Sequence, residues 1–240
     1  MSTSARTLAT GALLALGLAA APAVAPAAAP PATAPDADPT PQQVAAIERY
    51  WDSGEWARDS AAVAARASRF LAARVRAATR GIRRPAAARR AAGRLVAVFD
   101  IDDTVLSTYA CMKAGGFTVL SRTSCVVAAS HPPIKPVVRL VAQAQRAGVR
   151  VAFVTGRPDY LASTTRAQLS AVGVRGPYVL RLRPAADHDP SVVPFKSSAR
   201  RALQQGGRTV VLSIGDQRSD LAGGAATRLF KLPNPMYTLP

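Results

Sequence analysis

Short apolar runs alternate with helical stretches along the second half of the chain. Five runs have the length of strands, and they are Leu95 to Phe99, Val149 to Val154, Tyr178 to Leu182, Thr209 to Ile214 and Arg228 to Leu232. Three stretches between them are long enough for crossover helices, namely Val137 to Arg146, Tyr160 to Val172 and Phe195 to Gln205. This alternation predicts an α/β fold with a parallel sheet covered on both faces. Ligands of such sheets bind beyond the carboxyl ends of the strands, so the residues after each run are the first candidates for a site.

The first half of the domain has a helical pattern. Apolar residues recur at near-helical spacing from Gln42 to about Arg80, with one break at Ser53 and Gly54, which predicts two helices. Ten arginines lie between Arg66 and Arg94. They could form a groove for nucleic acid or another anionic polymer. Only one aromatic residue, Phe70, lies among them, however, and such sparse interleaving favours a solvated helix face over a specific nucleic-acid site.

The N-terminal residues have the pattern of a leader. One positive charge at Arg6 precedes the apolar run Leu8 to Ala21, and Ala-x-Ala patterns follow. This is typical of a secretory signal peptide, for which residues 1–27 are one choice among several cleavage positions. The run is shorter than the ~20 apolar residues of a spanning helix, so an uncleaved anchor is the less favoured alternative. Residues 28–41 are rich in Pro and Ala and are expected to form a linker to a domain of residues 42–240. We therefore expect a secreted protein.

Composition narrows the class of protein. The chain has 240 residues, of which 49% are hydrophobic, so it is neither intrinsically disordered nor too short for a sizeable core. Its formal net charge of +17 could also hold an exported protein at anionic cell-surface polymers. Cys111 and Cys125 are the only cysteines, and an even number in an exported chain favours a disulfide between them. We expect both histidines, His131 and His188, to lie on the surface.

The few carboxylates are clustered. The acidic residues between positions 60 and 158 follow the first apolar run, and those after position 190 follow the fourth; they are Asp100, Asp102, Asp103, Asp216 and Asp220. In so basic a chain, carboxylates that converge at strand ends favour a divalent cation, and oxygen-only ligands suit Mg²⁺ beside a substrate phosphate. Asp100 and Asp102 can both point into one crevice. One could attack a phosphate ester and form an aspartyl-phosphate while the other moves protons.

Four motifs give this pattern a likeness to a known superfamily. Asp100-Ile-Asp-Asp-Thr104 resembles the first motif of the haloacid dehalogenase (HAD) superfamily of phosphatases. Thr155 resembles the second motif, which implies that its hydroxyl and the N–H of Gly156 hold a phosphate oxygen. Lys196 resembles the third, a charge that offsets the nucleophile and the transferring phosphoryl group.

The fourth motif completes the implied ligand sets. It is Gly215-Asp-Gln-Arg-Ser-Asp220, in which Asp216 would coordinate Mg²⁺ and Asp220 would support the metal or Lys196. Arg157 has two interpretations of equal weight, contact with substrate phosphate or an ion pair with Asp159, and Asp103 is expected to be structural. The predicted catalytic set is Asp100, Asp102, Thr155 and Lys196. The predicted substrate set is Thr155, Gly156, Arg157 and Lys196. The predicted metal set is Asp100, Asp102, Asp216 and Asp220.

Within the superfamily, the sequence is most similar to subfamily IIIB, the exported acid phosphatases of the class B and plant storage-protein-like group. Three stretches carry this likeness: Tyr50 to Trp56, Asp100 to Tyr109 and Phe230 to Tyr237. The resemblance implies a Rossmann-like three-layer sandwich with five parallel strands in the order 5-4-1-2-3, a helical N-terminal segment, and a small cap at residues 105–136. Caps of this kind choose substrates. Storage members of the family have lost the nucleophile, whereas Asp100 is present here.

Taken together, these features predict an exported, Mg²⁺-dependent acid phosphatase for small phosphomonoesters, with "acid" following from the resemblance alone. Two alternatives stay open. A phosphotransferase of the same fold would pass the phosphoryl group to an alcohol other than water. A non-catalytic basic protein for binding or storage would use the arginine-rich helices and need no metal.

Overall fold

A computed structural model describes residues 29–239 except 33, 35, 36 and 129. The predicted signal peptide, residues 1–27, lies outside the described residues, and so does part of the predicted linker. Within the described ranges, no helix has the length and apolar character needed to cross a membrane.

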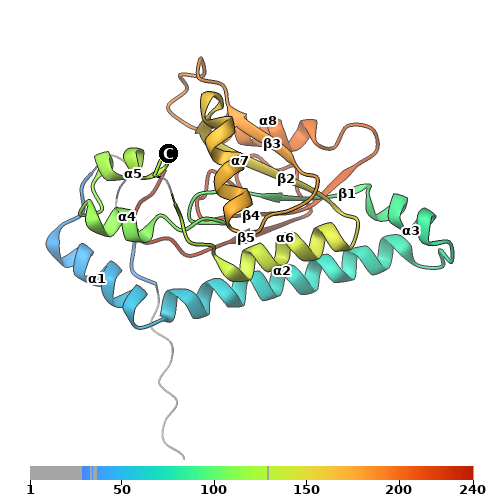
Figure 1. The fold of residues 1–240 in the computed structure, drawn as a ribbon, viewed down its shortest axis with the longest axis horizontal. Coiled ribbons are helices and arrows are strands. Elements are labelled where there is room, and N and C mark those ends of the chain that lie inside the picture. The colour runs from blue at the N-terminus through green and yellow to red at the C-terminus, as the bar shows by residue number, and fades with distance from the viewer. Residues whose placement is uncertain (1–28, 33, 35–36, 129, 240) are drawn as a thin grey trace, which may run out of the picture.

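Five parallel strands form one sheet in the order β3-β2-β1-β4-β5, which confirms the predicted order (Figure 1). The strands are β1 (Leu95–Phe99), β2 (Arg150–Pro158), β3 (Val179–Arg183), β4 (Thr209–Gly215) and β5 (Arg228–Lys231). Because all five run the same way, their carboxyl ends lie along one edge of the sheet and their amino ends along the other. The predicted runs match these strands to within a few residues at each end.

Helices cover both faces of the sheet and make three layers (Figure 1). They include α6 (Lys135–Arg146), α7 (Ala162–Ala171) after a short 3₁₀ turn η1 (Asp159–Leu161), and α8 (Val193–Ala202). Side chains alternate along β1: Phe99 packs into a core that includes Leu140 of α6, whereas Val98 packs against Leu203 after α8. This alternation of a strand buried on both faces is the α/β architecture that the apolar runs indicate.

The N-terminal segment forms three helices, α1 (Pro41–Asp52), α2 (Glu55–Thr79) and α3 (Pro85–Ala92). The predicted break is confirmed, because Gly54 takes a left-handed φ of 76° between α1 and α2. α2 runs alongside α6 below the sheet (Figure 1). α3 escaped prediction because its eight residues carry only alanine as apolar side chains, so they show no hydrophobic stripe.

The predicted cap region contains two short helices, α4 (Tyr109–Ala114) and α5 (Val119–Cys125). The disulfide between Cys111 and Cys125 is present and joins them, as the cysteine count indicates. In Figure 1 both helices lie beside the C-terminal end of the chain, at the carboxyl edge of the sheet.

Aromatic stacking brings the three family-like stretches together. The ring of Trp51 stacks on Trp56, with centroids 3.9 Å apart, and on Tyr109, with centroids 4.1 Å apart. Trp56 Nε1 also donates to the carbonyl of Pro233 at 3.1 Å. These contacts pack the N-terminal helices, the insert and the C-terminal tail against one another near the carboxyl edge of the sheet.

Candidate active site

All the predicted catalytic, substrate and metal residues line one pocket of about 600 Å³ at the carboxyl edge of the sheet. Asp100 follows β1, Thr155 lies in β2, and Asp216 follows β4, so parallel strands deliver all three to the same edge. Lys196 reaches them from α8. The topology brings together residues that are far apart in the sequence, as the motif order indicates.

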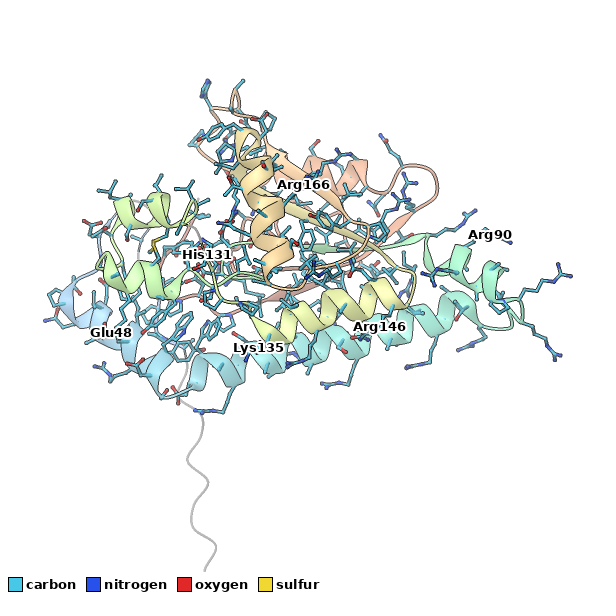
Figure 2. All side chains as sticks on the ribbon, viewed as in Figure 1. Glu48, Arg90, His131, Lys135, Arg146 and Arg166 are labelled. Atoms are coloured by element: carbon cyan, nitrogen blue, oxygen red, sulfur yellow. A yellow bond between two sulfur atoms is a disulfide. The ribbon has the colours of Figure 1, made fainter. Side chains whose placement is uncertain are left out.

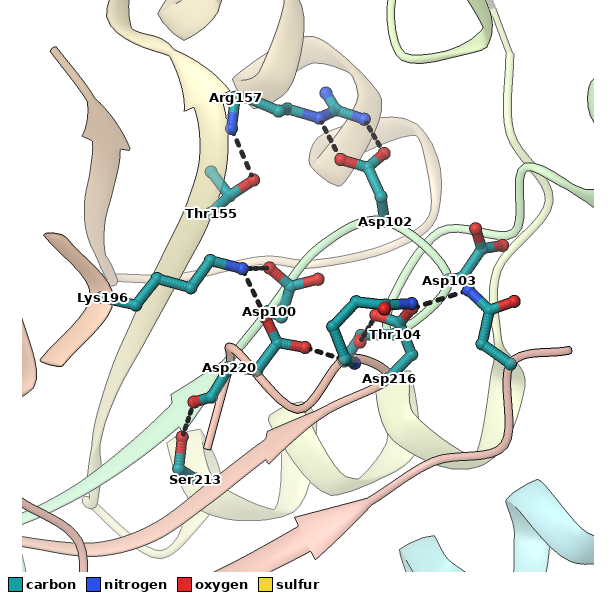
Figure 3. A network of polar contacts seen from close by, with 12 residues as sticks. Asp100, Asp102, Asp103, Thr104, Thr155, Arg157, Lys196, Ser213, Asp216 and Asp220 are labelled. Atoms are coloured by element: carbon teal, nitrogen blue, oxygen red, sulfur yellow. Dashed lines mark hydrogen bonds and ion pairs between the residues drawn. The ribbon is translucent and has the colours of Figure 1, made fainter. Parts of the chain in front are cut away.

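Lys196 lies between two carboxylates (Figure 3). Its Nζ donates to Oδ1 of Asp100 at 2.8 Å and also to Oδ1 of Asp220. Burial acts to lower the pKa of Lys196, but Asp100 and Asp220 outweigh it and leave that pKa raised, so the ammonium stays charged. Burial and then Asp220 raise the pKa of Asp100, while Lys196 opposes the rise. The lysine therefore favours the ionised carboxylate that a nucleophile needs.

Asp220 is held against a glycine. Its Oδ2 accepts from the backbone N–H of Gln217 at 2.7 Å. A Cβ at Gly215 would lie 2.3 Å from that same oxygen, so only glycine lets Asp220 pack here. Asp220 in turn orients Lys196, which fits the supporting role that the resemblance implies.

Asp216 is surrounded by donors. Its Oδ1 accepts from the Thr104 hydroxyl at 3.0 Å, and its Oδ2 accepts from Gln217 Nε2 at 2.6 Å and Asn234 Nδ2 at 2.7 Å. Burial, followed by the charge of Asp220, raises the pKa of Asp216 to about 6, although Asn234 and Gln217 oppose the rise. Three neutral side chains therefore position the Asp216 carboxylate, and none of them supplies a positive charge to offset it.

Three buried carboxylates make this a candidate cation site. Oxygens of Asp100, Asp216 and Asp220 all lie within 4.8 Å of one another. Against their three negative charges, Lys196 supplies one positive charge. Buried charge of one sign is costly unless it is compensated, and oxygen donors in this arrangement suit a hard divalent cation. The residues present therefore fit a bound metal ion.

The carboxylate of Asp102 lies outside that cluster and pairs with Arg157 (Figure 3). Arg157 Nε donates to Oδ2 at 2.8 Å and Nη2 donates to Oδ1 at 2.6 Å, which is the bidentate geometry of a strong ion pair. Its Nη1 donates to Thr165 and Gln168. The suggested pair with Asp159 is wrong, because Arg157 is turned to Asp102 and the guanidinium is buried there.

Asp103 is structural, as expected. Its φ is 51°, a left-handed conformation that Asp tolerates better than most residues. Its carboxylate accepts from the N–H and hydroxyl of Thr108, at 2.9 and 2.6 Å, and from the Tyr237 hydroxyl at 2.7 Å. Burial, together with the charge of Asp216, raises its pKa to about 7. These bonds fix the turn that carries Asp100 and Asp102.

The expectation for His131 is wrong, while His188 is exposed as expected. His131 is only 6% exposed, because the end of the insert folds back against the motif turn. The N–H of Ser107 donates to the carbonyl of Pro132 at 2.9 Å and holds that segment in place. Burial lowers the pKa of His131, so the ring is neutral near neutral pH.

Several supporting residues escaped prediction, and most belong to the C-terminal tail or contact it. Asn234 donates to Asp216, and the Tyr237 hydroxyl donates to Asp103. The N–H of Leu239 donates to Gln217 Oε1 at 3.0 Å. The family-like stretch Phe230 to Tyr237 was the only signal for this region. It has no periodicity that could assign its side chains to the site.

Comparison with known proteins decides the family. The family model of the HAD superfamily, subfamily IIIB (acid phosphatase), matches residues 12–240. The chain belongs to this family. It is 34% identical over 151 residues to acid phosphatase 1 of Solanum lycopersicum, a match that covers 60% of this chain and 59% of that protein. It is 31% identical over 149 residues to vegetative storage protein 1 of Arabidopsis thaliana, covering 60% and 55%. The chain thus spans less than two thirds of either relative.

Solved structures agree with the architecture. The class C acid phosphatase from Bacillus anthracis superposes with a TM-score of 0.60 and 19% identity, covering 82% of this chain and 85% of that one. The same enzyme with tungstate bound gives a TM-score of 0.62. At this level of identity the likeness concerns the fold alone.

Proposed function

We propose that this protein is an acid phosphatase that hydrolyses small phosphomonoesters through an aspartyl-phosphate on Asp100. The observation that carries the proposal is the contact of Lys196 with Asp100, which is one of three carboxylates clustered at the carboxyl ends of the strands. Family membership supports the reaction class. The relatives named acid phosphatase support the substrate class.

Asp100 is the nucleophile, and Asp102 is the general acid and then the general base. An oxygen of Asp100 attacks phosphorus, the ester P–O bond breaks, and protonated Asp102 gives its proton to the leaving alcohol. Ionised Asp102 then takes a proton from water, the water oxygen attacks phosphorus, and the bond to Asp100 breaks to release inorganic phosphate. Arg157 holds the ionised Asp102 carboxylate by two hydrogen bonds. When one Asp102 oxygen carries the proton, the other still accepts from Arg157, which keeps the group directed into the pocket.

Other residues would position the phosphoryl group. The Thr155 hydroxyl and the N–H of Gly156 line the pocket beside Asp100 and would bind phosphate oxygens. Lys196 would offset charge on the nucleophile and on the transferring group. Asp100 and Asp216 would hold Mg²⁺, which would supply charge neutralisation between the anionic nucleophile and the anionic substrate.

We also propose that the protein is exported. The support is the charged and apolar leader pattern of residues 1–27 together with the Cys111–Cys125 disulfide, a bond that persists in oxidising compartments. N-terminal sequencing of protein recovered from culture medium would test it. A sequence that begins near residue 28 is expected, and retention of the intact chain inside the cell would contradict export.

Hydrolysis of p-nitrophenyl phosphate tests the reaction. The chain is assayed from pH 4 to 8 with Mg²⁺ or EDTA, alongside Asp100→Asn and, as a matched control, Asp159→Asn, which changes an exposed carboxylate outside the pocket lining. Turnover should need the cation, vanish in Asp100→Asn and persist in Asp159→Asn. Acid-quenched enzyme should carry phosphate on the peptide that contains Asp100. Turnover that survives in Asp100→Asn would overturn the mechanism, and added alcohol acceptors that divert the phosphoryl group would identify a phosphotransferase.

A further inference from the structure

The edge of the sheet opposite the active site is cationic. Arg94 precedes β1, Arg150 begins β2, and Arg208 precedes β4. These positions are neighbours, because Val96 is in register with Arg150 and the N–H of Thr209 donates to the carbonyl of Arg94 at 2.9 Å. Since the strands are parallel, the three arginines lie at the amino edge while Asp100 and Asp216 lie at the carboxyl edge.

α3 and the turn before it extend this charge. Residues 60–99 contain ten arginines and no acidic residue. Those of α3 and the turn are exposed: Arg80, Arg83, Arg84, Arg89 and Arg90. None of them takes part in the ion pairs found among the described residues. Figure 2 shows Arg90 at the α3 end of the molecule, whereas Glu48 lies at the α1 end.

A second pocket opens within this cationic edge. It has a volume of about 370 Å³ and lies between α3, the end of α6 and the starts of β2 and β3. Arg89, Gln145, Arg150 and Tyr178 are among its lining residues, and no acidic residue lines it. Gln145 Nε2 is buried and has no hydrogen-bond partner within the described part of the chain. The pocket is therefore bordered by two arginines and by a glutamine whose amide nitrogen has no partner, a set that suits an anionic oxygen ligand.

We propose that this amino-edge site binds a linear phosphate polymer, with one phosphate group in the pocket and its neighbours along α3 and the α2–α3 turn. Arginine suits this partner because its guanidinium binds phosphate oxygens in a bidentate way. A single phosphate would use the pocket alone, whereas the exposed arginines continue beyond it. Binding there leaves the carboxyl-edge pocket open on the opposite side, and it does not depend on the proposed phosphatase activity.

Binding of end-labelled, long-chain inorganic polyphosphate to the full chain tests the proposal. All proteins carry Asp100→Asn so that the polymer is not consumed. Fluorescence anisotropy in 50 mM NaCl should show binding that weakens as salt is raised, since counterions are released. The double substitution Arg89→Gln with Arg150→Gln should raise Kd about tenfold or more. Gln145→Leu should raise Kd several-fold without changing the net charge, which separates a built site from simple charge attraction.

The matched control removes the same charge elsewhere. Arg49→Gln with Arg139→Gln changes two exposed arginines of α1 and α6, outside the pocket lining, and should alter Kd less than twofold. Equal weakening by both double substitutions would mean diffuse attraction and would overturn the proposal. So would the absence of polyphosphate binding, or an unchanged Kd in the pocket variants. Tighter binding to phosphatidylglycerol vesicles through the same residues would overturn it in favour of a membrane surface.

Discussion

Gly215 shows how one missing side chain can position the charges of the site. A Cβ there would lie 2.3 Å from Asp220 Oδ2, so Gly215→Ala should displace Asp220 and, through it, Lys196. Small misplacements of catalytic groups can cost on the order of 100-fold in rate, and we expect kcat for p-nitrophenyl phosphate to fall by about 10- to 100-fold. Gly93→Ala is the control, because its Cβ would come no closer than 3.3 Å to any atom, the nearest being the Arg89 carbonyl oxygen. A kcat within twofold of the parent in Gly215→Ala would contradict this role of Asp220.

His131 gives the fold a pH dependence at a single residue. Burial lowers its pKa from 6.5, so between the two pKa values the unfolded chain binds a proton that the folded chain does not. The stability it contributes is complete above pH 6.5 and is lost as the pH falls through the lower, folded pKa. We expect the free energy of unfolding to fall less from pH 7.5 to pH 5 in His131→Gln than in the parent. Urea denaturation at both pH values measures this, and parallel losses in the two proteins would contradict it.

At the scale of elements, the disulfide holds the helix that lines one side of the pocket mouth. α5 carries Leu120, which is 78% exposed and lines the active-site pocket, as do Val127 and Tyr160, both also exposed. An apolar mouth favours substrates with an aromatic or apolar alcohol, because these bury surface on binding. The proposed cap would therefore influence substrate choice through the position of α5.

Breaking the Cys111–Cys125 bond should affect selectivity before chemistry. Closing a loop of this size stabilises a protein by about 3 kcal/mol in the chain-entropy model, so Cys111→Ser with Cys125→Ser should lower Tm. The ratio of kcat/KM for phenyl phosphate over glycerol phosphate should fall several-fold, while kcat for glycerol phosphate stays within about twofold. Treatment of the parent with dithiothreitol should reproduce both changes. Unchanged melting and an unchanged ratio would contradict the role of the bond.

The elements also show what the sequence could and could not predict. β1 was predicted at its exact limits, because five apolar residues bounded by Gly93-Arg94 and Asp100 leave little choice. Motif order at strand ends placed all the proposed site residues in one pocket. α3 was missed because an alanine- and arginine-rich helix has no apolar stripe. The contacts of Arg157 and Tyr237 were missed because they depend on which distant segments the topology brings together.

At the scale of the whole molecule, the buried negative charge at the carboxyl edge of the sheet links metal binding to stability. Asp100, Asp216 and Asp220 are each at most 6% exposed, and Lys196 balances only one of their charges. Burial and neighbouring carboxylates raise the pKa values of Asp100 and Asp216, which indicates that charge here is costly without a further cation. A cation that binds the folded chain and not the unfolded one must therefore raise the free energy of unfolding.

The melting temperature measures this linkage without any assay of activity. At a Mg²⁺ concentration 100 times its Kd, the gain is about 2.7 kcal/mol, which for a domain of this size raises Tm by roughly 5 to 10 °C over the value in EDTA. Asp216→Asn removes a proposed ligand and should abolish most of the rise, whereas Asp159→Asn, outside the pocket, should keep it. Equal melting temperatures of the parent in Mg²⁺ and EDTA would show that the three carboxylates hold no cation. Lys196 would then offset their charge with no metal ion beside it.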